Sequence, residues 1–179
     1  GLFYALNKRN IKMCKLYANP YNTSVIGFYF SSYEEYEIKS SKLTDGFGYP
    51  VEEFEIEFID GELPHLFNAC SIDQCTLELW FEEIEILDES EQVEIYYRCE
   101  YLGQDTQEAI DKLNAEGTIY NCSVNDYALD YINDCGIIDC IPEHIQRYFD
   151  YEAFARDLEL SGEVCEFSYD HSTYTASGF

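Results

Sequence analysis

The chain has 179 residues, with 36 Asp or Glu against 10 Lys or Arg, so its formal net charge is −26. A surface of this sign repels phosphate backbones and anionic lipids, which excludes direct binding to nucleic acid or to a membrane surface. Leu, Ile, Val and Phe make up about a quarter of the sequence, enough apolar material for a core, which excludes a disordered acidic tail for most of its length.

The charge is divided unevenly along the sequence. Residues 1–42 hold six of the ten basic residues and three acids, whereas residues 43–179 hold four basic residues and 33 acids, a net charge of −29. No block of five like charges occurs, so the acids indicate a folded acidic surface. No apolar run is long enough to span a membrane and no signal peptide is apparent, so we expect a cytoplasmic protein.

Residues 1–62 are predicted to form a small antiparallel β-sheet with one helix. Two stretches, 13–19 and 25–30, are typical of strands joined by a turn-rich link, and residues 33–43 favour a short helix. Residues 52–60 alternate with a period of two, which predicts a strand with one buried face and one exposed face. The exposed face of this strand is a row of three carboxylates: Glu53, Glu55 and Glu57.

Residues 63–116 are predicted to form a small helical bundle. A helix over 72–88 has an apolar face and an acidic face. The apolar residues are Leu77, Trp80, Ile84 and Leu87. The acidic residues are Glu78, Glu82, Glu85 and Glu89. A second helix is expected over 90–102, and a third runs from Asp105, whose side chain suits an N-cap, to Gly117.

Residues 117–179 are predicted to form a mixed α/β module. Strands are expected over 118–122 and 163–168, and helices over 123–135, 142–149 and 150–160. The first of these helices places three carboxylates one turn apart, Asp126, Asp130 and Asp134. Its inner face is expected to consist of Leu129, Ile132 and Cys135. The fold class is therefore α+β, in three modules.

The spacing of the carboxylates allows two interpretations. Like charges four residues apart destabilise a helix by a few tenths of a kcal/mol, and the chain repeats this arrangement. The repeats are either solvated helix faces or rows of anions that are themselves functional. Same-face carboxylates lie roughly 5–6 Å apart. Duplex DNA carries one charge per about 1.7 Å of axis, so the −29 segment matches roughly 50 Å of duplex and would compete for a protein that grips DNA.

Sites of other kinds have weaker support. The sequence contains no nucleophile elbow, zinc-protease or phosphate-loop motif, and 36 acids give no means of choosing a catalytic pair. The eight cysteines lack framework spacing, so we expect them to be reduced and mostly small apolar core residues. A zinc site would have to draw on His65, Cys70, Cys75, Cys140 and His144, whose spacings match no recognised ligand pattern. We expect neither a metal nor a cofactor.

The segment from Ile141 to Gly162 resembles the closing segment of the ArdA antirestriction proteins. The likeness rests on a Tyr-x-Asp-Tyr motif followed by Arg-Asp-Leu and Ser-Gly, namely Tyr148, Asp150, Tyr151, Arg156, Asp157, Leu158, Ser161 and Gly162. Residues 16–28 resemble the opening hairpin of the family and residues 52–56 its acidic strand motif. The Asp-aromatic pair that usually follows in the family is replaced here by Phe58 and then Asp60.

The resemblance implies an elongated bacterial protein of three modules that dimerises through the last one. It implies a mimic of bent B-form DNA that occupies the DNA-binding groove of type I restriction-modification enzymes, in their methyltransferase core, without catalysis. Proteins of this kind travel on plasmids and conjugative transposons. On this hypothesis the phosphate-mimicking residues are Glu53, Glu55, Glu57, Glu78, Glu82, Glu85, Glu89, Asp126, Asp130 and Asp134.

Two alternative functions remain open at this point. The first is an acidic adaptor that binds another basic, DNA-associated protein. The second is a hydrolase that uses a pair of carboxylates converging in a pocket. Apolar residues at 137, 138 and 141 are expected to lie near the dimer contact.

Overall fold

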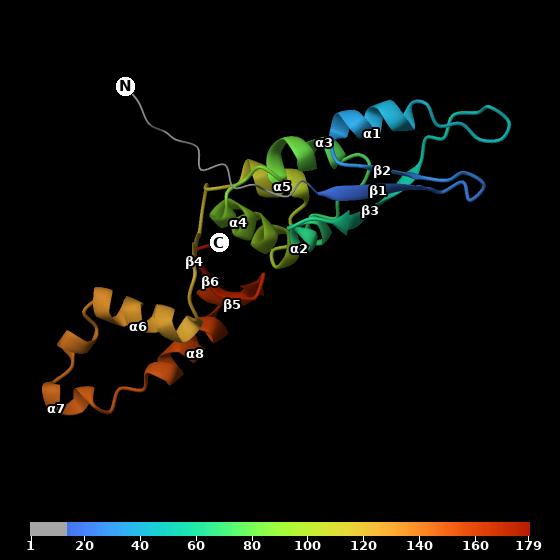
Figure 1. Cartoon of the computed structure of the whole chain (residues 1–179). Coiled ribbons are helices and arrows are strands. Elements are labelled where there is room, and N and C mark those ends of the chain that lie inside the picture. The colour runs from blue at the N-terminus through green and yellow to red at the C-terminus, as the bar shows by residue number, and fades with distance from the viewer. Residues whose placement is uncertain (1–13) are drawn as a thin grey trace, which may run out of the picture. The chain divides into compact units, whose positions relative to one another are not determined.

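The computed structural model describes residues 14–179 (Figure 1). Their packing defines two compact units, one ending at Asp88 and one starting at Glu89. Each unit contains a small antiparallel sheet of three strands together with helices, so the α+β prediction is confirmed. The division into three modules stays a prediction. Within the described part of the chain, no helix is both long and apolar enough to cross a membrane.

The sheet of the first unit consists of β1 (Lys15–Pro20), β2 (Phe28–Phe30) and β3 (Phe54–Asp60), in the order β2-β1-β3. Strand β2 is shorter than the predicted stretch 25–30. A turn closed by a hydrogen bond from the Val25 N–H to the Asn22 carbonyl takes up the preceding residues. Gly27, just before β2, passes so close to β1 that a Cβ atom there would lie 2.0 Å from the Ala18 carbonyl oxygen.

The two faces of this sheet differ as the alternating pattern predicts. Leu16, Ala18 and Ile56 are buried on the inner face. The outer face carries the Tyr17 and Tyr29 rings, whose centroids lie 4.8 Å apart on neighbouring strands. Cross-strand aromatic pairs of this kind help to fix the register.

Helices cover the inner face of the sheet. They are α1 (Tyr33–Ser40), α2 (Pro64–Ala69), α3 (Leu77–Leu79) and the π-helical turn η1 (Trp80–Ile84). Helix α1 starts where it was predicted but ends at Ser40, three residues early, and it is capped by Ser32, whose hydroxyl accepts the Glu35 N–H. Helix α2 was not predicted, although it begins at Pro64 and proline suits the first position of a helix.

The second unit alternates helices and short strands. Its elements are α4 (Glu89–Glu100), α5 (Thr106–Asp111), β4 (Thr118–Tyr120), α6 (Val124–Asp134), the 3-10 turn η2 (Ile138–Cys140), α7 (Glu143–Gln146), α8 (Tyr151–Ser161), β5 (Val164–Tyr169) and β6 (Ser172–Ser177). Asp105 caps α5 as predicted, but the helix ends at Asp111, well before Gly117, and Asn114 beyond its end adopts a positive φ of 59°.

Strand β6 was not predicted, although it forms the centre of the β4-β6-β5 sheet. It pairs with β5 through a tight turn in which Asp170 and His171 both have positive φ. That conformation is typical of a two-residue hairpin, for which Asn-Gly or Asp-Gly is the usual sequence signal. The Asp-His pair does not carry that signal, so the hairpin was missed.

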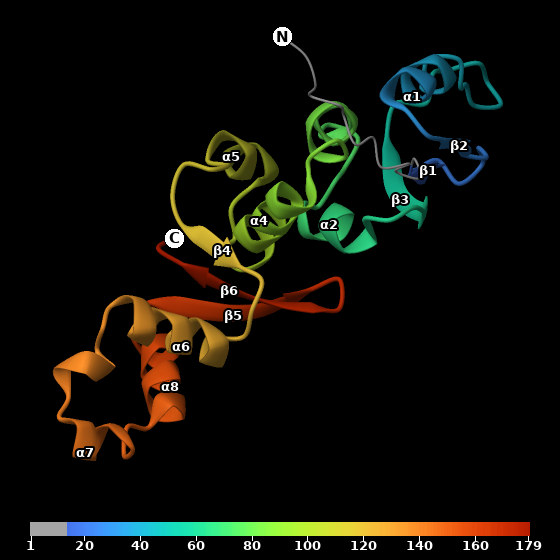
Figure 2. The same cartoon turned by 60° about the vertical axis from the view of Figure 1, so that its left-hand side comes forward.

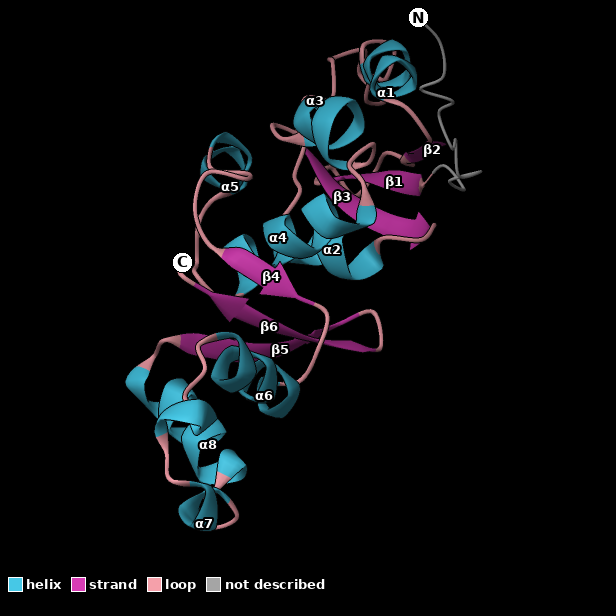
Figure 3. Cartoon of the chain, turned by 90° about the vertical axis from the view of Figure 1, so that its left-hand side faces the viewer, coloured by secondary structure: helices cyan, strands magenta, loops and turns pink. Residues whose placement is uncertain are grey.

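The sheet of the second unit is covered on both faces (Figure 2). On one face Tyr97 of α4 contacts Phe167 of β5, with 4.8 Å between ring centroids. On the other face, Val164 packs with Ala128 of α6 and Leu158 of α8. Figure 3 shows α6 and α8 side by side beneath the sheet, which leaves their opposite surfaces open to solvent.

Arg98 is a buried basic residue of α4. Its Nε donates to Glu94 at 2.8 Å, its Nη2 donates to the Glu116 carbonyl at 3.0 Å, and its guanidinium lies 5.0 Å from the centroid of the Phe179 ring. A buried charge requires such partners, because desolvation costs several kcal/mol. Arg98 therefore ties α4 to the segment before β4 and to the end of the chain.

Candidate functional site

The acidic side chains lie almost entirely on the surface. All 36 acids fall within residues 14–179; thirty of them are exposed, five are half-buried and one is buried. The same residues include only seven Lys or Arg, so the described part of the chain carries a net charge of −29. Most carboxylates are therefore available to a partner.

Helix α6 presents the most regular row of acids. Asp126, Asp130 and Asp134 are all exposed and stand one turn apart on the same helix face. The row lies outward because the opposite face is anchored by buried residues spaced four apart, Val124, Ala128 and Ile132.

The predicted inner face of this helix was partly wrong. Ile132 is buried as expected, but Leu129 and Cys135 are exposed. The α8 helix and the sheet pack against the face that carries Val124 and Ala128, and Leu129 points away from both. The position of the aspartates is unaffected by this correction.

The start of α6 is fixed by hydrogen bonds that also involve the first aspartate. The Ser123 hydroxyl accepts the backbone N–H of Asp126 at 3.2 Å and donates to its carboxylate at 2.6 Å. Beside this cap, burial raises the pKa of the Cys122 thiol, and the negative charges of Asp126 and Asp130 raise it further. The negative charges of the row thus also act on the Cys122 side chain, next to the start of the helix.

A second group of acids gathers in the first unit, around Tyr33 of α1. Partial burial raises the pKa of its phenol, and the charges of Glu37, Glu78 and Glu82 contribute in the same direction. These glutamates are all exposed and come from two segments, α1 and the stretch from α3 to η1. Glu37 was not predicted as a site residue, because tertiary packing that no local pattern indicates brings it and Glu78 to bear on the same phenol.

Glu85 was expected on the same outer face as Glu78 and Glu82, and this expectation was wrong. Its side chain is only 9% exposed and accepts the Cys14 backbone N–H at 2.9 Å. The cause is the π-helical turn, in which the Glu85 N–H bonds to the Trp80 carbonyl five residues back. A π turn takes one more residue than an α turn, so Glu85 is brought round to the inner side.

The predicted acidic strand is only partly a row of free carboxylates. Glu55 of β3 is exposed, as is Glu53 immediately before the strand. Glu57 is half-buried and accepts a hydrogen bond from the Asn19 side chain at 2.9 Å. Glu89 is exposed at the first position of α4 and so belongs to the second unit.

The motif at 148–162 forms the start, the body and the end of α8. Asp150 caps the helix by accepting the Ala153 N–H at 2.9 Å, and Gly162 ends it in the left-handed region with φ of 77°. Leu158 is buried in the core of the unit. The remaining motif residues are exposed: Tyr148, Tyr151, Arg156, Asp157 and Ser161. Part of the motif is therefore structural, and part remains on the surface.

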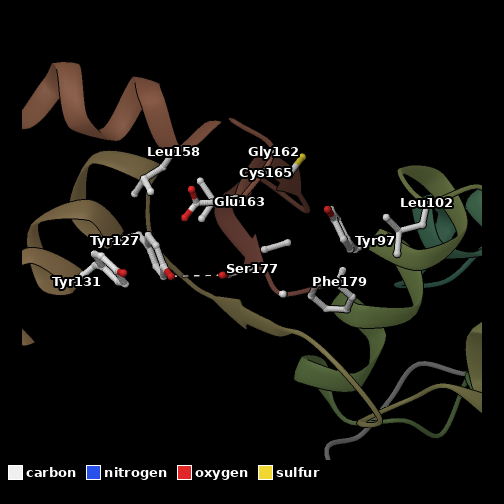
Figure 4. Close-up of a pocket in the computed structure, with 13 residues that line it drawn as sticks. Tyr97, Leu102, Tyr127, Tyr131, Leu158, Gly162, Glu163, Cys165, Ser177 and Phe179 are labelled. Atoms are coloured by element: carbon white, nitrogen blue, oxygen red, sulfur yellow. Dashed lines mark hydrogen bonds between the residues drawn. The ribbon is translucent and has the colours of Figure 1, made fainter. Parts of the chain in front are cut away.

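A cavity of about 480 Å³ lies at the end of the β5–β6 pair in the second unit. Figure 4 shows Tyr127 and Tyr131 of α6 on one side of it and Tyr97 of α4 on the other. The Tyr127 hydroxyl donates to the Ser177 hydroxyl at 3.3 Å. Glu163 is the one carboxylate among the lining residues, so this cavity does not provide the pair of acids that a glycosidase-like hydrolase needs.

The candidate metal ligands do not converge. Within residues 14–179, no group of three or more His, Cys, Asp or Glu side chains is arranged to hold a metal ion. The eight cysteines form no disulfide, and only three of them, Cys14, Cys70 and Cys99, are buried. The prediction that they are mostly core residues was therefore wrong.

These features define a class of protein before any comparison: a small α+β protein that presents ordered rows of exposed carboxylates. The family model described as antirestriction protein (ArdA) matches residues 22–173. The chain therefore belongs to the ArdA family, whose proteins are DNA mimics that inhibit type I restriction enzymes and are not themselves enzymes. No curated protein gives a significant match to the chain.

Proposed function

We propose that two groups of exposed carboxylates replace DNA phosphates in the groove of a type I restriction-modification enzyme. The first group is the α6 row, Asp126, Asp130 and Asp134. The second is the cluster around Tyr33, formed by Glu37, Glu78 and Glu82. The observation that supports the proposal is the α6 row. One face of this helix is buried in the protein, and the opposite face therefore presents three exposed carboxylates at a fixed spacing. Glu53, Glu55 and Glu89 extend the anionic surface.

The physical basis is a set of many weak contacts. An exposed ion pair is worth about 0.2–1 kcal/mol, so no single carboxylate dominates the affinity. Together the anions attract a groove that is itself basic, and they displace DNA because both ligands need the same Lys and Arg side chains. Glu85 is not part of this surface, because it is buried against β1.

We further propose that the chain acts as a homodimer in the bacterial cytoplasm, where a mobile element would need protection from restriction. The resemblance of the segment 141–162 to the ArdA family supports this proposal. The last third of the chain also exposes apolar side chains, among them Ile145, Tyr148 and Leu160. The residues that the sequence predicted near the dimer contact, at 137, 138 and 141, are half-buried. Sedimentation over a range of protein concentrations tests the dimer, and a monomer at all concentrations would contradict it.

The test of the main proposal is binding to a purified type I methyltransferase at several salt concentrations. We expect the wild-type chain to bind and to displace DNA, with affinity that falls steeply as salt screens the charges. Neutralising the α6 row with Asp126→Asn, Asp130→Asn and Asp134→Asn should weaken binding about tenfold, as three exposed contacts are lost.

A charge-matched control separates a specific row from general acidity. The variant carrying Glu62→Gln, Glu100→Gln and Asp170→Asn loses the same three charges from sites outside the two groups. We expect it to bind within about twofold of the wild-type chain. Equal weakening of the two triple variants would show that net charge alone matters, and unaltered binding of the α6 variant would remove that row from the interface.

A further inference from the structure

The first unit carries an exposed aromatic turn between α1 and β3. We name residues 44–50 the Phe47 turn; Phe47 at its tip is 89% exposed and Tyr49 is 69% exposed. An exposed phenylalanine ring leaves a large apolar area in water, and burial of that area in a partner would favour binding. Figure 1 shows this turn projecting from the end of the first unit, beyond α1.

The Phe47 turn is preorganised by its own hydrogen bonds. The Asp45 carboxylate accepts the backbone N–H groups of Phe47 at 2.8 Å and Tyr49 at 2.9 Å. The Asp45 N–H donates to the Tyr49 carbonyl at 2.8 Å, and Thr44 and Pro50 form a β-bridge. A rigid turn loses little conformational entropy when it inserts into a partner. Phe47 is therefore presented as a fixed projection.

The surroundings of this projection are acidic. Glu52 and Glu53 are exposed shortly after the turn, and residues 51–62 contain six acids and no base, whereas one base, Lys42, lies just before the turn. The β1–β2 loop lies beside them, because the Tyr21 N–H donates to the Glu53 carbonyl at 3.2 Å. A flat apolar ring within a field of carboxylates fits a partner that has an apolar slot bordered by basic side chains.

A methyltransferase that modifies a DNA base has such a slot. Enzymes of this kind extrude the target nucleotide from the duplex and hold its base in a pocket by stacking against aromatic or apolar side chains. DNA bound there thus presents a row of phosphates and one projecting planar ring. We propose that Phe47 enters the target-base pocket of the modification subunit in place of the extruded base; this inference rests on the proposed function.

Other exposed apolar side chains fit this role less well. Ile26, on the neighbouring loop, is exposed but not planar, so it cannot stack as a base does. In the second unit, the Tyr148 ring is already contacted by the Arg147 guanidinium, 4.8 Å from its centroid. Phe47 combines a planar ring, a rigid backbone and acidic neighbours, which are the features that a base on a phosphate backbone presents.

Affinity for the purified methyltransferase at fixed salt provides the first readout. Phe47→Ala should weaken binding about 30-fold, the effect of losing a central aromatic anchor of about 2 kcal/mol, whereas Phe47→Trp should keep it within a few-fold. The matched control is Ile86→Ala, at a residue of the same unit that is 68% exposed, and it should bind like the wild-type chain. Circular dichroism verifies that each variant is folded.

A crosslink provides the second readout. With the photoreactive amino acid benzoylphenylalanine at position 47, we expect crosslinked peptides from the target-base pocket of the modification subunit; the same group at position 86 should not give them. If the wild-type chain fails to bind the enzyme, the proposed function fails. If the wild-type chain binds but Phe47→Ala binds equally well, or the crosslink maps outside the pocket, the role of Phe47 is overturned while the carboxylate proposal stands.

Discussion

The backbone N–H of Cys14 donates a 2.9 Å hydrogen bond to the carboxylate of Glu85, joining the start of the first strand to the end of the π-helical turn. The same cysteine accepts a hydrogen bond at its Sγ from the Trp80 indole at 3.3 Å. Burial raises the pKa of its thiol to about 12, and Glu85 contributes in the same direction. In a protein whose acids lie otherwise at or near its surface, this carboxylate has a structural role.

Replacing Glu85 should therefore reduce stability. Glu85→Ala leaves the buried Cys14 N–H without its acceptor, which costs about 1–3 kcal/mol. Glu85→Gln keeps a carbonyl oxygen at the same place and should cost less. Denaturant unfolding measures both, with Glu82→Ala as the exposed control that stays within about 0.5 kcal/mol of the wild-type chain. A Glu85→Ala variant as stable as Glu82→Ala would mean that the hydrogen bond contributes nothing.

Gly27 is predicted to tolerate no side chain. A Cβ atom there would lie 2.0 Å from the Ala18 carbonyl oxygen and 2.8 Å from the Tyr17 ring, so Gly27→Ala must push β1 and the residues before β2 apart. Forcing extra atoms into a packed site costs about 1–3 kcal/mol. Gly46→Ala is the control, because a methyl group at that position would meet no other atom within 4 Å. Thermal unfolding should show a lower Tm for Gly27→Ala alone, and equal values would contradict the close approach.

The elements that the sequence predicted correctly are those with a strong local signal. The alternation of Phe54 and Ile56 with glutamates predicts β3, and Asp105 was predicted correctly as a helix N-cap. In each case the structure is determined by a hydrogen bond or a periodicity that lies within a few residues. Such signals also placed the α6 aspartates correctly on the surface.

Two features of the acidic surface that were missed, the burial of Glu85 and the place of Glu37, depend on long-range packing. The π turn that buries Glu85 is supported by contacts with Cys14, 71 residues earlier in the chain. Glu37 and the pair Glu78 and Glu82 come from separate elements, yet all three raise the pKa of the Tyr33 phenol. No window of the sequence contains both partners of either relationship, so periodicity alone could not predict them.

Deprotonation of the Tyr97 phenol should make the folded protein less stable at alkaline pH. Burial, followed by the influence of Cys165, raises the pKa of its phenol from 10.0 to about 12. The folded state therefore retains a proton that the unfolded chain releases, so the stabilisation is complete below pH 10 and is lost as pH rises towards 12. Tyr97→Phe should flatten this part of the pH profile of the unfolding free energy. An unaltered slope in Tyr97→Phe would contradict the assignment.

Substitutions at the two ends of the α6 row should change the stability of the protein in opposite directions. Both should weaken binding to the methyltransferase. Asp134 is the last residue of the helix, where a negative charge opposes the helix dipole, so Asp134→Asn should stabilise the protein by about 0.3–1 kcal/mol. Asp126 lies in the first turn and accepts the Ser123 hydroxyl, so Asp126→Asn should destabilise it by a similar amount. Each substitution removes one negative charge, so each should weaken binding to the methyltransferase by a few-fold at low salt. Unfolding and binding measurements on these two variants separate the effect of each aspartate on stability from its effect on binding. Binding that followed stability instead of charge would show that the row is only a solvated helix face.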